Sequence, residues 1–397
     1  MRSFAKARLL TFFVISMIIS NPGFSQKIER LDGSEIRADS LTSVISHLAQ
    51  LGKVHGLAVT IYNNNQPAYQ HTFGYKNYEQ KLPLTNTTNI YGASLSKAVF
   101  SVLVMKLIEQ GVIDLDTPLE SYLSQKIYEY TSLTRWHDHY SDLKTDTLYH
   151  KITARMCLDH TSGFPNWRWF EPDQKLRVKF EPGSRYSYSG EGLVYLQVVL
   201  EKLTGRGLED LAKELIFKPL GMNRSSYQWQ KAFEQDFAYG HTNEGKLYEK
   251  DTDNEPRSAS TLETTAEDYT KFLTAVLQQK ILQPASMKVI FTPQIRIRSI
   301  AQFGPLSEKE TTLYDGIQLS YGLGWGLLKT PYGIGAFKEG HGDGFQHYSI
   351  VFPEAKKGIL IMTNSDNGES IFKALLEIGI GDIYTPWEWE GYIPYSK

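Results

Sequence analysis

A serine and a lysine stand three residues apart, at Ser94 and Lys97, at the start of a nearly all-apolar segment. Positions i and i+3 share one face of a helix, so the hydroxyl and the amine can meet there. The free N–H groups of a helix N-terminus add partial positive charge beside the hydroxyl. Burial disfavours the ammonium form, which would let Lys97 act as a base. The spacing therefore indicates a nucleophilic serine; the alternative is an N-capping serine followed by a solvated lysine.

Two further segments combine hydroxyl, amine and imidazole groups with the glycines of tight turns. Residues 182–190 read Pro-Gly-Ser-Arg-Tyr-Ser-Tyr-Ser-Gly and directly precede a predicted helix. Residues 338–345 read Lys-Glu-Gly-His-Gly-Asp-Gly-Phe and lie between two predicted strands. Three shorter stretches accompany them: Asp-His-Thr-Ser-Gly at 159–163, Pro-Leu-Gly-Met at 219–222 and Tyr-Gly-Leu-Gly-Trp at 321–325.

In this order the motifs resemble those of the serine β-lactamase and penicillin-binding-protein superfamily, specifically its class C β-lactamase-like and D-alanyl-D-alanine carboxypeptidase/esterase branch. That family carries S-x-x-K, Y-x-N and K-T-G or H-x-G along the chain. The resemblance covers about residues 40 to 375. It implies an acyl-serine hydrolase that acts on a small-molecule or peptide substrate and needs no cofactor and no metal.

The resemblance also implies roles for particular residues. Ser94 resembles the nucleophile and Lys97 its base partner. Tyr188 matches the family tyrosine, whose phenol helps to move protons. The backbone N–H groups of Ser94 and His341 would form the oxyanion hole, and such donors are the expected dominant electrostatic contribution to catalysis.

The predicted substrate-binding positions depart from the family pattern in two places. Lys338 and Gly340 match the first and third positions of K-T-G. Gly190 stands where Asn is usual, so a side-chain amide for the substrate is missing. Glu339 stands where Thr is usual, in a place where relatives bind a substrate carboxylate, and it would repel that group unless Lys338 neutralised it. Both departures leave acyl-serine chemistry intact and predict poor β-lactam turnover.

Other groups invite different chemistry. The string His-Asp-His at 137–139 resembles metal ligands, and a zinc hydrolase is the second enzyme class. No further His follows at the usual spacing, so a polar loop is favoured. We interpret His160 as a structural turn residue and Cys157 as a buried small hydrophobe, whereas the His341 side chain could line the pocket. A catalytically weak sensor of cell-wall fragments is the alternative to a live enzyme.

The elements that must position these residues follow from residue patterns. β-Rich runs occur near both ends, and helical patterns dominate between them. We therefore expect an α/β fold of the α+β type: an antiparallel sheet built from both termini and flanked by helices, with an inserted, mostly helical domain. The sheet domain is predicted over 26–111 and 284–397, with Ser94 at its interface with the helical insertion at 112–283.

The expected elements carry particular ranges. Helices are predicted over 40–51, 95–110, 191–204, 208–217, 266–279 and 369–378. Strands are predicted over 55–62, 68–75, 319–328, 334–338, 345–352 and 358–363.

The first 25 residues predict a signal peptide and hence an exported protein, periplasmic or secreted from a bacterium. A basic start is followed by an apolar run, Leu9 to Ile19, that is short for a membrane span. An uncleaved anchor is the alternative, and no stable membrane span is expected after cleavage. The net charge of −2 over 397 residues gives no basic excess for nucleic acid. The single Cys excludes an intrachain disulfide.

Overall fold

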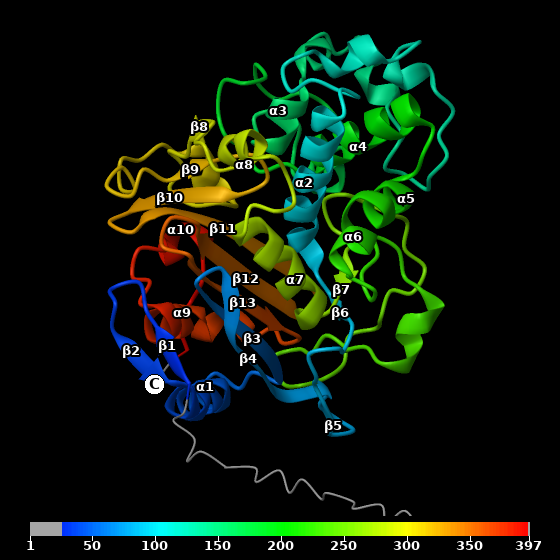
Figure 1. The fold of residues 1–397 in the computed structure, drawn as a ribbon. Helices are drawn as coiled ribbons and strands as arrows, with labels where there is room; N and C mark the ends of the chain where they lie inside the picture. The colour runs from blue at the N-terminus through cyan, green and yellow to red at the C-terminus, as the bar shows by residue number, and fades with distance from the viewer. Residues whose placement is uncertain (1–25, 396–397) are drawn as a thin grey trace, which may run out of the picture.

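The computed structural model describes residues 26–395 and has a nine-stranded sheet at its centre (Figure 1). The strand order is β5-β4-β3-β13-β12-β11-β10-β9-β8, and every pairing is antiparallel. The N-terminal and C-terminal parts of the chain join where β13 pairs with β3. This confirms the predicted antiparallel sheet built from both termini. The strands are β3 (Gly56–Asn63), β4 (Gln66–Asn77), β5 (Leu82–Pro83), β8 (Ile295–Arg296), β9 (Ser320–Tyr321), β10 (Gly326–Thr330), β11 (Gly333–Gly342), β12 (Phe345–Phe352) and β13 (Lys357–Thr363).

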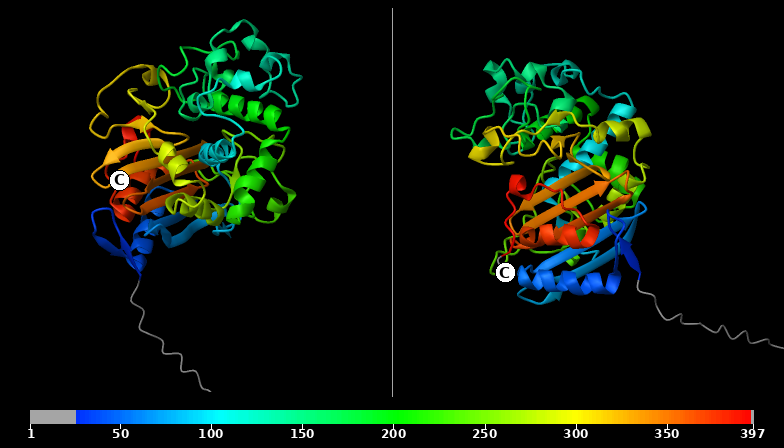
Figure 2. Two further views of the ribbon diagram at one scale, coloured as in Figure 1. Left: turned by 45° about the horizontal axis from the view of Figure 1, so that its top comes forward. Right: turned by 90° about the vertical axis from the view of Figure 1, so that its left-hand side faces the viewer.

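Helices cover both faces of this sheet (Figure 2). Along β13 the side chains alternate, because successive residues of a strand point to opposite faces. Leu360 and Met362 pack with α2 (Ser96–Glu109) and α7 (Ala266–Leu277). Ile359 and Ile361 pack on the other face with α1 (Ala38–Leu51), α9 (Phe372–Ile380) and α10 (Trp387–Glu390). The sheet is therefore a buried platform between two apolar layers.

Helix α2 is buried almost all round, which explains its nearly continuous apolar sequence. It runs between the sheet and the helical region (Figure 1), and a 3-10 turn, η1 (Ala93–Leu95), leads into it. The remaining helices are α3 (Ala154–Leu158), α4 (Gly190–Thr204), α5 (Leu208–Ala212), α6 (Lys218–Leu220) and α8 (Pro284–Ile290). Two small ribbons complete the fold: β1 (Lys27–Glu29) with β2 (Glu35–Arg37), and β6 (Ile90–Tyr91) with β7 (Glu263–Thr264).

Three predicted elements differ in detail. The strand expected over 319–328 is two strands, because the Gly322 N–H donates to the Trp325 carbonyl and closes a turn between β9 and β10. The helix expected over 208–217 changes to a π-helical turn, η7 (Lys213–Phe217), after α5. The helix expected over 369–378 begins as a 3-10 turn, η10 (Gly368–Ile371), before α9.

Two sequence predictions are not tested by this fold. The predicted signal peptide, residues 1–25, lies outside the described residues. The division into a sheet domain and a helical domain stays a prediction, although the strands of the central sheet all lie within 26–111 and 284–397. Among residues 26–395, no helix is both long enough and apolar enough to cross a membrane.

Candidate active site

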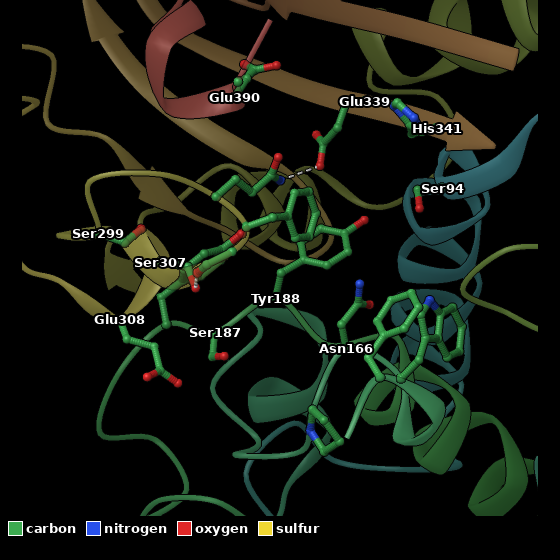
Figure 3. Close-up of a pocket in the computed structure, with 18 of the residues that line it drawn as sticks. Ser94, Asn166, Ser187, Tyr188, Ser299, Ser307, Glu308, Glu339, His341 and Glu390 are labelled. Carbon is green, nitrogen blue, oxygen red and sulfur yellow. Dashed lines mark hydrogen bonds between the residues drawn. The ribbon is translucent and has the colours of Figure 1, made fainter. Parts of the chain in front are cut away.

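Ser94 lies in the turn at the N-terminal end of α2. It lines a cavity of about 630 Å³, a size typical of small-molecule sites. Its neighbour Ala93 has a positive φ of 47°, a conformation that non-glycine residues rarely adopt. The Ser96 hydroxyl holds this turn by donating to the Ala93 carbonyl and accepting from the N–H of Leu262. The strained turn therefore presents the Ser94 side chain to the cavity (Figure 3).

Lys97 directs its amine at this serine from one helical turn along α2. Its Nζ lies 2.9 Å from Ser94 Oγ and donates to the Ala259 carbonyl at 2.7 Å. The side chain is fully enclosed, and burial lowers the pKa of Lys97 well below its usual value, with a further contribution from the positive charge of Lys338. A neutral amine beside the hydroxyl can accept its proton.

Tyr188 projects its phenol toward the same point from the turn before α4 (Figure 3). Its OH lies 3.3 Å from Lys338 Nζ, and the Lys97 amine lies 4.8 Å from the centre of its ring. Burial raises the pKa of Tyr188, and Lys338 opposes that rise. The phenol is thus protonated at neutral pH and able to donate a proton.

The His160 ring packs against the Tyr188 ring. The two ring centres lie 4.3 Å apart, and His160 Nδ1 accepts a hydrogen bond from the Ser189 N–H. Burial lowers the pKa of His160 well below its usual value, helped by Lys97 and Lys338. A neutral, enclosed imidazole that touches Tyr188 fits the structural interpretation of His160.

Strand β11 brings the third motif to Ser94. At Gly340 an added Cβ would lie 2.8 Å from the Gly92 carbonyl, so only glycine permits this approach of β11 to the turn that carries Ser94. The His341 side chain is exposed, and its Nδ1 lies 2.7 Å from Glu369 Oε1. This hydrogen bond raises the pKa of His341. The backbone of 340–341 therefore lies beside the turn that carries Ser94, where the oxyanion hole is predicted.

Glu339 is held as an anion inside the cavity wall. Its Oε1 lies 3.1 Å from Lys338 Nζ and accepts from Gln302 Nε2 at 2.7 Å (Figure 3). Burial would raise the pKa of Glu339, but Lys338 and Gln302 outweigh it and the pKa is lowered. For Lys338 burial acts in the opposite direction and lowers the pKa. The interactions with Glu339 and Tyr188 are larger than this effect, so the pKa of Lys338 is raised. Lys338 therefore offsets the charge of Glu339 in part, while Glu339 Oε2 has no hydrogen-bond partner among residues 26–395.

The space beside Gly190 is filled by a neighbouring loop. An added Cβ at Gly190 would lie 2.7 Å from two ring carbons of Trp167 and 2.9 Å from the Asn166 carbonyl. The Asn166 side chain lies at the cavity wall, and its Oδ1 accepts from the Gly190 N–H at 3.1 Å (Figure 3). Position 190 therefore has no side-chain amide, but the side-chain amide of Asn166 lies next to it at the cavity wall.

A buried ion pair anchors this loop. Arg168 Nη2 lies 2.7 Å from Glu191 Oε2, and both the backbone N–H and Nε of Arg168 donate to Glu191 Oε1. The Glu191 side chain is fully buried on α4. Because the pair ties the loop to the helix that follows Tyr188, it also fixes Asn166 and Trp167.

The 137–139 string and Cys157, the remaining candidates from the sequence, are not among the residues that line this cavity. In the 137–139 string, Asp138 accepts from the N–H groups of Leu133 and Thr134, and His139 Nε2 contacts the Thr134 carbonyl. Within residues 26–395, no group of three or more His, Cys, Asp or Glu side chains is arranged to hold a metal ion. Cys157 is fully buried in α3, which confirms its interpretation as a core residue.

Comparison with known proteins identifies the family. Residues 41–378 match the family model described as Beta-lactamase, so the chain belongs to this family. Penicillin-binding protein 4* of Bacillus subtilis (strain 168) is 24% identical over 344 residues, covering 78% of this chain and 68% of that protein. A D-aminopeptidase of Brucella anthropi is 26% identical over 193 residues, covering 48% of this chain and 36% of that protein.

A solved structure confirms the fold class. The penicillin-binding protein homologue from Pyrococcus abyssi superposes with a TM-score of 0.65 at 22% identity. The match covers 90% of this chain and 80% of that one. The predicted β-lactamase-like fold is therefore correct.

Proposed function

We propose that this protein is an exported serine hydrolase that cleaves an ester or amide through an acyl intermediate on Ser94. The observation that carries the proposal is the 2.9 Å contact between Ser94 Oγ and a Lys97 amine whose charged form is disfavoured by burial. Membership of the Beta-lactamase family supports serine hydrolase activity in general. The resemblance adds the roles of Tyr188 and of the two backbone donors.

The proposed reaction begins when Lys97 takes the proton of Ser94 Oγ. The oxygen then bonds to the substrate carbonyl carbon, and the backbone N–H groups of Ser94 and His341 stabilise the resulting oxyanion. Tyr188 gives its proton to the departing oxygen or nitrogen as the bond to that atom breaks. The proton on Lys97 restores the phenol, and water later attacks the acyl-serine with Lys97 and Tyr188 again handling the protons.

Within this reaction class we propose that activated short-chain esters are better substrates than penicillins or cephalosporins. Glu339 places a buried carboxylate where relatives bind a substrate carboxylate, and Trp167 fills the space of the missing Asn side chain at Gly190. A lost hydrogen-bond partner costs about 1–3 kcal/mol, and the like charge of Glu339 adds to this cost, reduced by the neighbouring Lys338. D-Amino-acid peptides are further candidates. Equal kcat/KM for a cephalosporin and a 4-nitrophenyl ester would contradict this preference.

Labelling with a serine-directed fluorophosphonate tests the nucleophile. We expect the wild-type protein to be labelled and Ser94→Ala to be unlabelled, with nearly the same thermal midpoint. Undiminished labelling of Ser94→Ala would overturn the assignment. A folded wild-type protein that takes up no label and hydrolyses no ester would instead favour the alternative, a sensor of cell-wall fragments.

Export is proposed from the basic start and apolar run of residues 1–25. Expression of the full chain in a bacterium, followed by mass spectrometry of the N-terminus, tests it. We expect the exported protein to begin near Gln26. A protein that retains Met1 in the cytoplasmic fraction would contradict the proposal.

A further inference from the structure

One end of the cavity carries carboxylates from three separate parts of the chain. Glu339 comes from β11, Glu369 from η10 and Glu390 from α10, and all three line the same cavity as Ser94. Figure 3 shows Glu339 between Ser94 and Glu390. A substrate that reaches from Ser94 along this wall therefore meets Glu339 first and Glu390 beyond it.

Two of these carboxylates are buried and incompletely paired. Glu339 is 6% exposed and Glu390 is 7% exposed. For each of them Oε2 has no hydrogen-bond partner among residues 26–395. Glu390 Oε1 has only a long contact, 3.4 Å, with the Tyr348 hydroxyl. Because buried carboxylate oxygens ordinarily accept hydrogen bonds, these two side chains, which both line the cavity, have capacity for a further donor.

The cations near the cavity do not supply that donor. Lys338 is fully buried and already contacts Tyr188 OH and Glu339 Oε1. Lys179, which also lines the cavity, is paired with Glu171 at 3.2 Å. The His341 imidazole is paired with Glu369. Within the described part of the chain, these three groups thus already have partners, and none of them is paired with Glu390.

We infer that the end of the cavity formed by Glu339 and Glu390 binds a positively charged amino group of the substrate. The preferred substrates are then esters or amides that carry an ammonium group, in the acyl half or in the leaving half. An ammonium at this end can donate to the Glu339 and Glu390 side chains and supply the positive charge that Glu390 lacks. This inference rests on the proposed hydrolase function and names its substrate class.

Burial and charge at Glu390 agree with this occupant. Burial raises the pKa of Glu390 well above its usual value, and Glu339 and Glu369 add to the rise. A cation beside Glu390 would favour its ionised form and so reverse the rise. A substrate carboxylate would instead add a further negative charge to the same end.

Matched ester pairs test the inference because each pair exchanges an ammonium for a methyl group. For the acyl half, 4-nitrophenyl 3-aminopropanoate is compared with 4-nitrophenyl butanoate. For the leaving half, 4-(aminomethyl)phenyl acetate is compared with 4-ethylphenyl acetate. After correction for spontaneous hydrolysis, we expect kcat/KM to favour the cationic ester by about tenfold or more in at least one pair, the size of one charge-assisted hydrogen bond. The responding pair identifies the half that reaches Glu390.

Glu390→Gln keeps the shape of the side chain and removes its charge. We expect it to abolish most of the cationic preference in the responding pair. Glu388→Gln, the same change at an exposed position of α10 away from the cavity, should keep the wild-type ratio. A wild-type ratio near one in both pairs, or a ratio that survives Glu390→Gln, would overturn the inference while leaving the hydrolase proposal standing.

A binding measurement separates this inference from the hydrolase proposal. Calorimetry needs no turnover and can cover both halves: 4-(aminomethyl)phenol is compared with 4-ethylphenol, and 3-aminopropanamide with butanamide. We expect the cationic ligand of at least one pair to bind measurably better and Glu390→Gln to weaken it about tenfold. If the protein takes up no fluorophosphonate label and hydrolyses no ester, the hydrolase proposal fails and calorimetry still decides the inference. Equal binding within both pairs would refute it.

Discussion

Gly190→Ala tests whether the loop beside the active site excludes any side chain at this position. A helix start normally favours Ala over Gly by about 0.5–1 kcal/mol, because Gly loses more backbone entropy on folding. Here the new Cβ would lie 2.7 Å from two carbons of the Trp167 ring and 2.9 Å from the Asn166 carbonyl. Overpacking of this kind costs about 1–3 kcal/mol. We therefore expect a net loss of about 1–2 kcal/mol in the free energy of unfolding.

Urea unfolding of four proteins measures this loss: wild type, Gly190→Ala, Trp167→Ala and the double variant. Removal of the Trp167 ring should reduce the cost of Gly190→Ala by about 1 kcal/mol, the coupling expected of two groups in contact. Gly316→Ala is the matched control, because an added Cβ there meets nothing within 4 Å and its φ is not positive. Ala at that position should leave the stability unchanged or raise it by a few tenths of a kcal/mol.

The reasoning fails if Gly190→Ala stabilises the protein as helix propensity alone would predict. It also fails if the cost is the same with and without Trp167. The outcome bears on substrate choice, because Asn at 190 needs the same Cβ. We therefore expect Asn at 190 to be accommodated at lower cost when Trp167 is made smaller.

Three further predictions concern the proton carriers and the loop that frames them. Lys97→Ala and Tyr188→Phe should each lower kcat on a 4-nitrophenyl ester by about 10²-fold or more, and near-wild-type turnover would remove the role of that residue. Lys338→Met removes a charge that lowers the pKa of both Lys97 and Tyr188. Since the proposed reaction needs neutral Lys97 and protonated Tyr188, both limbs of the kcat/KM profile should move to higher pH, by on the order of one pH unit. An unmoved acid limb would contradict this. Arg168→Ala leaves the buried Glu191 carboxylate without its partner and should lower the free energy of unfolding by about 3–5 kcal/mol in urea titrations. A loss below about 1 kcal/mol would show that the pair does not anchor the loop.

The contact between Ser94 and Lys97 and the strands around Lys338 were predictable because short spacings and strong local patterns determine them. Ser94 and Lys97 are three residues apart at the start of an apolar helix, and their observed contact follows from helix geometry. The strand-turn-strand pattern around Lys338 likewise predicted β11 and β12. The sheet was predicted from the β-rich runs near both ends of the sequence, apart from the turn at 322–325 that divides β9 from β10.

The walls of the cavity were not predictable in the same way. Asn166, Trp167 and Gln302 lie in loops, where no periodicity fixes the direction of a side chain. Glu390 reaches the cavity from the C-terminal end of the described chain, far in sequence from Ser94. One signal was available: Glu390 belongs to the Trp-Glu-Trp-Glu string of α10, and an acid among large aromatics is a candidate for burial.

The departures at Gly190 and Glu339 are therefore best understood together with the residues that surround them. Glu339→Thr would remove the carboxylate that keeps the fully buried Lys338 paired and would leave the Gln302 amide without its acceptor. A buried charge that loses its partner is strongly destabilising, and here that charge also lowers the pKa values of Lys97 and Tyr188. The family residue at one position consequently cannot be exchanged alone: Glu339 is coupled to Lys338 and Gln302, as Gly190 is coupled to Trp167 and Asn166. Changes of substrate preference through positions 190 and 339 should then require paired substitutions, while the Ser94 and Lys97 contact, formed within a single helical turn, tolerates them.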